Sequence, residues 1–356
     1  MMLALHARAL SSEELATDHL ADNPAGGKSI SVLQLDQANA QFEQLLTDDS
    51  LIEQIDQLYS ETGAVLLRGL PIADTYQAEQ LLAAWGVTFD DEYLGGASPR
   101  SKLSEHFFTS TEAPPSYVIS FHTEMCYLKQ RPGKVFFYCI TEPARYGETP
   151  VFNCAAMLDM LSPATRDKVE RLGMIYQRYF GTRKAKFFNV YKTWYDAFHA
   201  ETREQAEAAC RQQGLEWEWQ PNGGLITRAK MPGVMLDANS GQPCISLTLY
   251  NGEAAPYDLS KFAHRIPVLQ RFGLSAFIRA QYFKKNVFMR TLWGDGSPIS
   301  RAETRELIDV AWRAATLFRW RQGDLLILDN IRCGHGRLNV EAPRKIAAAL
   351  GDPYQI

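Results

Sequence analysis

His122 and Glu124 are separated by one residue and together offer an imidazole nitrogen and a carboxylate oxygen to a metal ion. The stretch 117–121 before them is rich in β-branched and aromatic residues, which predicts a strand. Because side chains alternate faces along a strand, His122 and Glu124 would point the same way and Thr123 the other way. A single His-x-Glu pair is a weak motif, so its meaning depends on a third ligand.

His335, far along the chain, is the candidate third ligand. It follows the apolar run 325–328, which predicts a buried strand, and the pair Asp329-Asn330, which predicts a turn. Two histidines and one carboxylate form the facial triad that binds Fe(II) and leaves positions open for a bidentate 2-oxo acid and O2. One fold must therefore bring these distant segments together.

The composition of the 356-residue chain is that of an ordinary soluble protein, with 46% hydrophobic and 22% charged residues. A net charge of -4 argues against nucleic-acid binding. No apolar run approaches the roughly 18 residues of a membrane helix, and the N-terminus does not resemble a signal peptide. Six cysteines without a Cys-x-x-Cys pair favour reduced thiols in the cytoplasm. We therefore expect a cytoplasmic protein with a small-molecule partner and with neither nucleic acid nor a membrane as partner; its oligomeric state is left open.

The segments around these ligands alternate between the patterns of strands and helices. Apolar runs predict strands at 64–70, 134–140, 149–152, 318–320, 324–328 and 344–350. Helical spacing predicts helices at 36–58, 75–85, 155–172 and 301–318. No internal repeat and no long linker divides the chain, so we expect a single domain over 1–356, with a variable segment at 1–30 and an insertion at about 179–233.

Several motifs follow His122-x-Glu124 in a fixed order: Gly147-Glu148-Thr149-Pro150, the run WRQGDLLILDN at 320–330, His335-Gly336-Arg337 and Pro343-Arg344-Lys345. From about Gly63 to the C-terminus this order resembles the taurine dioxygenase-like (TauD/TfdA) family of Fe(II)/2-oxoglutarate-dependent oxygenases. The nearest branch is that of natural-product amino-acid hydroxylases, with clavaminate synthase more distant. The resemblance implies a mainly β fold with helical insertions, built on a double-stranded β-helix, the jelly-roll or cupin-like barrel.

Carried over position by position, the resemblance implies that His122, Glu124 and His335 bind Fe(II). Many family members have aspartate where this chain has Glu124. Thr149 matches the threonine that hydrogen-bonds the distal carboxylate of 2-oxoglutarate, and Arg344 matches the arginine that pairs with it bidentately.

The position of that arginine departs from many members, which place it ten or more residues after the second histidine, where this chain has Lys345. Neighbours in a strand face opposite ways, so only one of the two can point into the barrel. Arg344 is the better candidate because it follows Pro343, as in the hydroxylase branch. Arg337 is expected either to bind the co-substrate or to position His335.

The implied reaction consumes 2-oxoglutarate and O2, releases succinate and CO2, and oxidises a C–H bond of an amino acid or of an amino-acid-derived natural-product intermediate, free or carrier-bound. Related halogenases have a small residue where Glu124 stands, so we expect hydroxylation or a related oxidation and no halogenation. Two alternatives are a metal-dependent hydrolase with the same ligands and a non-catalytic jelly-roll binding protein. The hydrolase leaves Thr149 and Arg344 without a role.

Other residues are expected to have ordinary structural roles; they are His106, His199, His264, Trp217 and Trp219. Arg100 and Arg178 are weaker candidates for anchoring the carboxylate of an amino-acid substrate.

Overall fold

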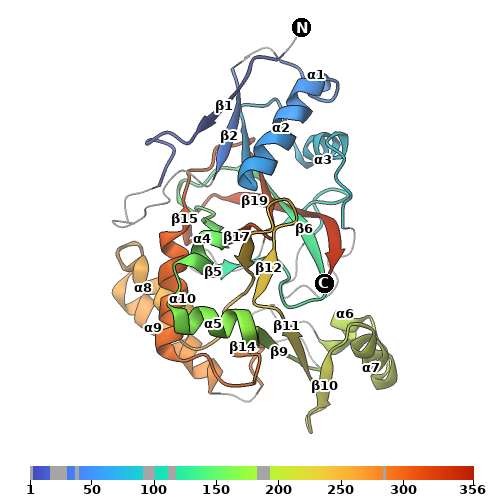
Figure 1. Cartoon of the computed structure of the whole chain (residues 1–356), viewed down its shortest axis with the longest axis vertical. Helices are drawn as coiled ribbons and strands as arrows, with labels where there is room; N and C mark the ends of the chain where they lie inside the picture. The colour runs from blue at the N-terminus through green and yellow to red at the C-terminus, as the bar shows by residue number, and fades with distance from the viewer. Residues whose placement is uncertain are drawn as a thin grey trace.

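The computed structural model describes residues 3–16, 30–36, 40–90, 101–110, 118–182, 193–283 and 286–356. Its elements are a mixture of sheets and helices (Figure 1), so the expected description as mainly β is too strong. The N-terminal strands and helices lie at one end of the molecule, and the helices α6 (Trp194–Phe198) and α7 (Arg203–Gln212) lie near the other (Figure 1).

A seven-stranded sheet crosses the molecule in the order β1-β2-β3-β16-β6-β19-β4. Its strands are β1 (Leu5–Ala9), β2 (Ser31–Leu35), β3 (Ala64–Arg68), β16 (Leu325–Asp329), β6 (Gln130–Thr141), β19 (Lys345–Gln355) and β4 (Phe108–Thr109). Neighbours are antiparallel except for β2 and β3, which are parallel. The large sheet therefore places the C-terminal strand β19 beside β6, the strand that follows the first two candidate ligands.

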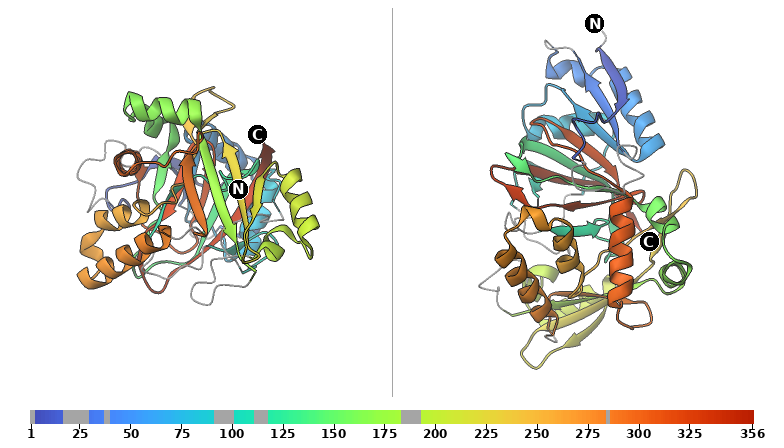
Figure 2. Two further views of the ribbon diagram at one scale, coloured as in Figure 1. Left: turned by 90° about the horizontal axis from the view of Figure 1, so that it is seen from below. Right: turned by 90° about the vertical axis from the view of Figure 1, so that its left-hand side faces the viewer.

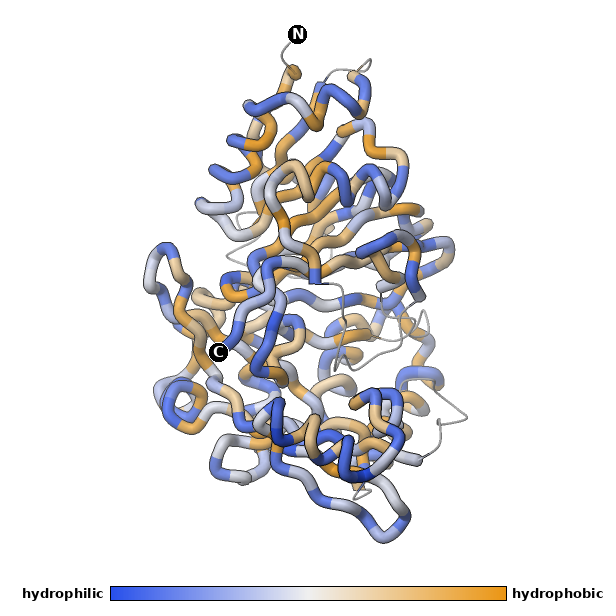
Figure 3. Tube along the Cα trace, turned by 90° about the vertical axis from the view of Figure 1, so that its right-hand side faces the viewer, coloured by the Kyte–Doolittle hydropathy of each residue, from blue (hydrophilic) through white to orange (hydrophobic). Residues whose placement is uncertain are grey.

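The predicted strand 325–328 is apolar throughout because both faces of this sheet are covered. Leu326 and Leu328 belong to an apolar core on one face, whereas Leu325 and Ile327 belong to a second core on the other face. Helix α2 (Asp49–Thr62) covers the second core. Figure 3 shows the hydrophobic residues concentrated along these central strands.

A smaller sheet, here called the site sheet, has the order β15-β8-β17-β5. Its strands are β15 (Ala315–Thr316), β8 (Val151–Asn153), β17 (Cys333–Arg337) and β5 (Ile119–His122). Phe121, Phe152 and Cys333 from these strands share the first core with Leu326 of the large sheet. The site sheet thus packs on the large sheet, and the two hold β5 next to β17.

A buried ion-pair cluster secures the start of β16. Arg68, at the end of β3, donates two hydrogen bonds to the carboxylate of Asp324, at 2.9 and 2.6 Å, and one to Glu14 at 2.8 Å. All three residues are buried. Asp324 of the motif at 320–330 therefore has a structural role in joining two strands of the large sheet.

A third sheet has the order β10-β11-β9-β14. Its strands are β10 (Glu216–Trp219), β11 (Leu225–Met231), β9 (Met174–Phe180) and β14 (Met289–Trp293). Two short pairs, β12 (Val234–Leu236) with β13 (Pro243–Ile245) and β7 (Arg145–Tyr146) with β18 (Val340–Glu341), complete the strands.

Some predicted helices and strands have different limits in the structure. The expected helix 36–58 is two helices, α1 (Phe42–Leu45) and α2, and the expected helix 155–172 is α4 (Cys154–Asp159) and α5 (Pro163–Leu172). Asp48 and Ser162 cap the second helix of each pair, which explains both interruptions. Helix α3 (Thr75–Ala84) has its predicted limits within one residue.

The C-terminal part contains two further differences. Helix α10 (Arg301–Arg313) ends before residue 318 because the chain turns into β15, which pairs with β8. Residues 318–320 contribute only an isolated bridge between Phe318 and Leu15 and are not a strand.

Three helical segments, α8 (Ala254–Lys261), η1 (Ala263–Arg265) and α9 (Val268–Tyr282), lie along one side of the molecule (Figure 2).

None of the helices in the described ranges combines the length and the apolar character that a membrane crossing requires. The six cysteines all lie within those ranges and are buried and free.

Candidate functional site

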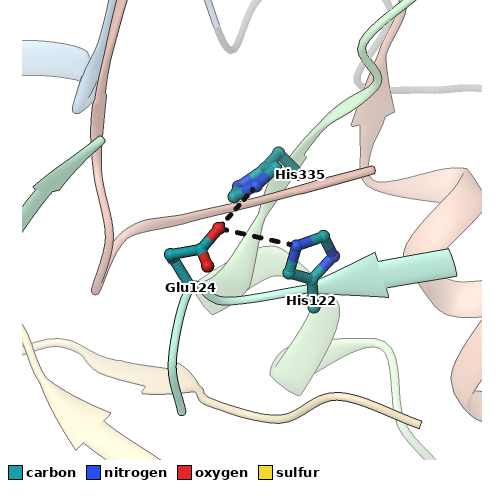
Figure 4. A group of neighbouring side chains, drawn as sticks. All are labelled: His122, Glu124 and His335. Atoms are coloured by element: carbon teal, nitrogen blue, oxygen red, sulfur yellow. Dashed lines mark ion pairs between the residues drawn. The ribbon is translucent and has the colours of Figure 1, made fainter. Parts of the chain in front are cut away.

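The three candidate ligands lie together where β5 and β17 meet (Figure 4). His335 is directly opposite His122 in the antiparallel register of the two strands. Glu124 Oε2 lies 3.8 Å from His122 Nε2 and 3.5 Å from His335 Nε2. One ligand atom from each of the three residues falls within 4.8 Å of the others. This donor set of two imidazoles and one carboxylate suits a divalent iron ion.

Glu124 reaches the two histidines from a turn and not from a strand. β5 ends at His122, and a turn begins at Glu124. Met125, the next residue, has a φ of 55°, which is uncommon for a residue with a side chain. Strand alternation therefore does not explain why His122 and Glu124 face one another; the turn does.

Asn330 holds this turn through both ends of its amide side chain. Its Oδ1 accepts from the backbone N–H of Glu124 at 2.7 Å, and its Nδ2 donates to the carbonyl of Glu124 at 2.9 Å. Nδ2 also donates to the carbonyl of Pro132 at 2.8 Å. From the sequence, the pair Asp329-Asn330 predicts only a turn, although the place of Asn330 five residues before His335 is a usable signal for a role at the site.

Arg131 stabilises the rest of the turn from its buried position at the start of β6. Its guanidinium donates to the carbonyl of Leu128 at 2.7 Å, to the carbonyl of Cys126 at 2.5 Å and to the hydroxyl of Ser246 at 3.0 Å. These bonds satisfy backbone carbonyls that would otherwise be buried without partners. The turn that carries Glu124 is therefore fixed by two polar side chains, Asn330 from the turn that follows β16 and Arg131 from β6.

Each histidine is oriented by its surroundings. His122 Nδ1 lies 3.0 Å from the carbonyl of Ser120, which favours a proton on Nδ1 and leaves the Nε2 lone pair toward Glu124. The His335 ring packs edge-on against Phe137, with ring centroids 5.0 Å apart. Both imidazoles thus turn Nε2 toward the carboxylate.

Gly334 lets β17 approach β5 closely enough for the histidines to meet. A Cβ atom at residue 334 would lie 2.1 Å from the ring of Phe121, which is far inside a van der Waals contact. A Cβ atom at Gly336 would lie 2.7 Å from the backbone oxygen of Ile119. The glycines on either side of His335 are therefore required by packing.

A small cavity, partly open to solvent, connects the three ligands with Thr149, Arg337 and Arg344. The Arg344 guanidinium donates to the carbonyl of Gly147 at 2.9 Å and to Thr149 Oγ1 at 3.3 Å. Trp320 Nε1 also donates to Thr149 Oγ1, at 3.2 Å. Because Thr149 accepts from two N–H groups, its own proton remains to be donated to a ligand. Trp320 was not identified from the sequence as a residue of this site.

The cavity also carries positive charge, from Arg337 and Arg344. Burial lowers the pKa of Arg344 to about 10, and the nearby charge of Arg337 contributes to the decrease. Burial likewise lowers the pKa of Arg337 to about 10. Both groups remain cationic at neutral pH, and the hydrogen bonds of Arg344 go to neutral oxygens. An anion bound here would offset the cost of burying the two charges.

Two of the remaining candidates, Lys345 and Arg178, are not among the residues that line this cavity. Lys345, the neighbour of Arg344, is exposed. Arg178 is buried on β9, where its guanidinium stacks over the rings of Tyr127 and Phe180 at 4.9 and 4.7 Å. Arg100 lies outside the described residues.

The histidines and tryptophans expected to be structural are part of the packing elsewhere. His106 stacks on Phe89 with ring centroids 4.3 Å apart, His199 ends α6 and His264 lies in η1. Arg211 lies over the ring of Trp217, and Trp219 donates to Glu207 of α7 at 2.8 Å, so the two tryptophans join β10 to α7.

The sequence matches the model of the family described as "Taurine catabolism dioxygenase TauD, TfdA family" over residues 28–350. A clavaminate synthase-like protein of Arabidopsis thaliana is 28% identical over 301 residues, which cover 83% of each chain. The dapdiamide synthesis protein DdaC of Enterobacter agglomerans is 26% identical over 316 residues, covering 86% of this chain and 89% of DdaC. The fold is similar to that of PvcB, described as an Fe, alpha-ketoglutarate dependent oxygenase from an isonitrile synthetic pathway, with a TM-score of 0.51, 16% identity and coverage of 97% and 91%.

Proposed function

Because the chain belongs to the Taurine catabolism dioxygenase TauD, TfdA family, and is thus an enzyme that uses Fe(II), 2-oxoglutarate and O2, we propose that it hydroxylates or otherwise oxidises a C–H bond of an amino acid or an amino-acid-derived natural-product intermediate. The observation that carries this proposal is one cavity that joins a two-histidine, one-carboxylate cluster to an arginine–threonine pair. Family membership leaves the hydrolase and the non-catalytic binding protein without support.

His122, Glu124 and His335 would hold the iron. Their donor atoms fit it, because two neutral nitrogens and one anionic oxygen leave a divalent ion with open positions for co-substrates. Bound there, Fe(II) supplies the redox chemistry in which 2-oxoglutarate and O2 give succinate, CO2 and one oxygen atom for the substrate. The chain's own residues fix the ligand directions: the Ser120 carbonyl orients His122, and Asn330 holds the backbone of Glu124.

Arg344 and Thr149 would bind the distal carboxylate of 2-oxoglutarate. A guanidinium with its charge available and a hydroxyl with a free proton match the two oxygens of a carboxylate. Arg337 adds a second positive charge to the same cavity and would bind co-substrate or substrate there. Lys345, which is exposed, is not assigned a role in binding.

The substrate class is supported by the relatives. DdaC is a dapdiamide synthesis protein, and PvcB is described as belonging to an isonitrile synthetic pathway. Both descriptions concern natural-product synthesis, in keeping with an amino-acid-derived substrate, free or carrier-bound. Because a carboxylate, Glu124, stands beside His122, the reaction would be oxygen transfer or a related C–H oxidation and not halogenation.

We also infer the finer architecture. The large sheet and the site sheet, which share one apolar core, would form the double-stranded β-helix of a single domain over 1–356. In this domain the segment 1–30 would be variable, and the insertion at about 179–233 would carry substrate contacts. The six buried, free cysteines favour a cytoplasmic location.

The test is to reconstitute the protein with Fe(II) and 2-oxoglutarate in the presence of O2. Succinate release is measured first, and a panel of amino acids, free and as carrier-bound thioesters, is then examined by mass spectrometry. A product heavier by one oxygen or lighter by two hydrogens, formed in step with succinate, supports the proposal. A mainly halogenated product in the presence of chloride would contradict it.

The ligand assignment is tested with His122→Ala and His335→Ala. Each change removes one of three protein ligands, so succinate production should be lost while the protein stays folded. His264→Ala is the matched control, because His264 lies in η1 outside the cavity. Near-normal succinate production by either of the first two variants would show that the altered residue is not a ligand.

A further inference from the structure

The hydroxyl oxygen of Thr149 accepts hydrogen bonds from two sides. Trp320 Nε1 donates to Thr149 Oγ1 at 3.2 Å, and the Arg344 guanidinium donates to the same oxygen at 3.3 Å. A threonine hydroxyl has two lone pairs and one proton. With both lone pairs engaged, only the proton is left for a third partner. Because Thr149 lines the cavity, this proton is available to a molecule bound there.

The indole of Trp320 is held in place by the chain around it. The backbone N–H of Arg321, the next residue, donates to the carboxylate of Asp324 at 2.8 Å, and Asp324 is paired with the buried Arg68. The Trp320 ring is buried and packs edge-on against Phe318, with ring centroids 4.7 Å apart. A buried indole N–H needs an acceptor, and the Thr149 hydroxyl provides it. The direction of the Trp320 N–H is therefore fixed by packing and by this bond.

The Thr149 hydroxyl and the Arg344 guanidinium consequently present only donors to a ligand. A carboxylate offers only acceptors and fits such a pair. A carboxamide offers one acceptor and an NH2 group, and its NH2 group would face a donor. Polar groups that are buried without a partner are costly, so the amide is rejected. Without the Trp320 N–H, one lone pair of Thr149 would be free to accept from an amide.

We propose that Trp320 is a positioning residue that makes the Thr149 hydroxyl an obligate hydrogen-bond donor, so that this end of the cavity selects a carboxylate over an uncharged amide. The proposal rests on the proposed function, in which Thr149 and Arg344 bind the distal carboxylate of 2-oxoglutarate. It adds a residue that does not touch the co-substrate but decides what the threonine can bind.

The effect of Trp320 should be modest in size. The two hydrogen bonds to Thr149, at 3.2 and 3.3 Å, lie at the long end of the usual range for N–H···O bonds. Loss of one such bond should change the affinity for a carboxylate by about three- to tenfold. The preference for a carboxylate over an amide is therefore a more specific readout than affinity alone.

The test uses two unreactive probes and no turnover. The full-length protein is loaded with Mn(II), and binding is measured by isothermal titration calorimetry. One probe is N-oxalylglycine, an analogue of 2-oxoglutarate with the same distal carboxylate, and the other is N-oxalylglycinamide, in which a carboxamide replaces that carboxylate. The wild type should bind N-oxalylglycine at least about a hundredfold more tightly than the amide.

Trp320→Phe keeps an aromatic ring and removes the N–H. It should weaken N-oxalylglycine about three- to tenfold and leave the amide unchanged or bound more tightly, so the preference should fall at least about threefold. Trp320→Met, a flexible apolar side chain that also lacks an N–H, should lower the preference in the same way. Agreement between the two variants would assign the effect to the N–H and not to the shape of the ring.

Trp312→Phe is the matched control. Trp312 is also buried, and its Nε1 donates to Asp258 at 2.8 Å, but it is not among the residues that line the cavity. This variant should bind both probes as the wild type does. The free energy of unfolding and the Mn(II) affinity, measured for every variant, separate a general loss of structure from a change in preference.

A double-mutant cycle tests whether Trp320 acts through Thr149. Thr149→Val keeps the shape of the side chain and removes the hydroxyl. In the Thr149→Val background, Trp320→Phe should no longer change the preference between the two probes. Residues that act through one another show such coupling, whereas independent residues have additive effects.

Several results would overturn the proposal alone: an unchanged preference in Trp320→Phe, equal losses for both probes, the same change in Trp312→Phe, or an effect that persists in the Thr149→Val background. A Mn(II)-loaded wild type that binds neither probe would instead contradict the co-substrate assignment itself, and this proposal with it. Tight binding of N-oxalylglycine by the wild type therefore separates the two cases.

Discussion

Replacing Asn330 with alanine should weaken the fold and the metal site together. The buried Asn330 side chain makes three hydrogen bonds, two of them to the backbone of Glu124 and one to the carbonyl of Pro132. Alanine leaves one N–H and two carbonyl groups without these partners. Each such group costs about 1–3 kcal/mol when water cannot replace the partner, so the loss for the three groups is roughly 3–9 kcal/mol. This is a large part of the roughly 5–15 kcal/mol that stabilises a typical domain.

The same change should lower metal affinity, because Glu124 is then held less firmly in the direction of His122 and His335. Residues that orient metal ligands typically contribute about 10–100-fold to affinity. The free energy of unfolding is measured by urea denaturation of the metal-free protein. Metal affinity is measured by competition between the folded protein and a chelator for Fe(II) or Mn(II), without any need for the substrate.

Asn153→Ala provides a matched control on the neighbouring strand β8. Asn153 Oδ1 accepts from the N–H of Ala156 at 2.8 Å and caps α4. Its loss should cost about 1 kcal/mol of stability and leave metal affinity unchanged. The reasoning is refuted if Asn330→Ala binds metal as tightly as the wild type, or if it is no less stable than Asn153→Ala.

Three further predictions concern the proposed co-substrate end of the cavity and the buried acid Asp258. Arg344→Ala removes the charge beside Thr149, for an expected loss of about 2–5 kcal/mol in the binding free energy of 2-oxoglutarate, and should raise its apparent KM at least about tenfold. Lys345→Ala should change this KM little. The reverse result would assign the anchor to Lys345. Arg265 pairs with the buried Glu148, at 2.8 and 3.1 Å, directly beside the turn that carries Thr149. Arg265→Ala should therefore destabilise the fold by about 3–5 kcal/mol, and it should raise the KM for 2-oxoglutarate more than it lowers metal affinity. An unchanged KM would contradict this. Burial raises the pKa of Asp258 to about 6 from an ordinary value of 3.8, so the stability it contributes is present below about pH 4 and is lost as the pH rises through 6. Asp258→Asn keeps an acceptor for the Trp312 N–H. Relative to wild type, this variant should therefore be more stable at pH 8 than at pH 4, by about 3 kcal/mol in urea denaturation. Equal effects at both pH values would refute the raised pKa of Asp258.

Sequence patterns predicted the central strands well, and they named three candidate ligands that the structure places close together. The strands at 64–70, 134–140 and 325–328 correspond to β3, β6 and β16 because a buried strand needs an apolar side chain at nearly every position when both faces of its sheet are covered. The ligand candidates could be named because the side chains that bind Fe(II) are few and their chemistry is local. The motif order then indicated which distant segments had to meet.

Helix limits were predicted less well. Asp48 and Ser162 each begin a new helix inside a stretch whose apolar spacing alone favoured one continuous helix. Helix α10 ends at Arg313 because residues 315–316 pair with β8, which is distant in sequence. Strand pairing between distant segments can end a helix even where the local spacing of apolar residues favours its continuation. Such pairing cannot be read from the spacing of residues within one segment.

The sequence by itself determined which side chains were available for chemistry, whereas the tertiary structure decided how they are held and which way they face. Asn330 and Trp320 became visible as parts of the site only because their partners, Glu124 and Thr149, are more than 150 residues away along the chain. Arg344 faces the cavity and Arg178 does not, although both are arginines in or beside strands. Hydrogen bonds and burial are properties of pairs of groups in space. Residue type and spacing along one chain constrain such pairs only when both members lie in the same element.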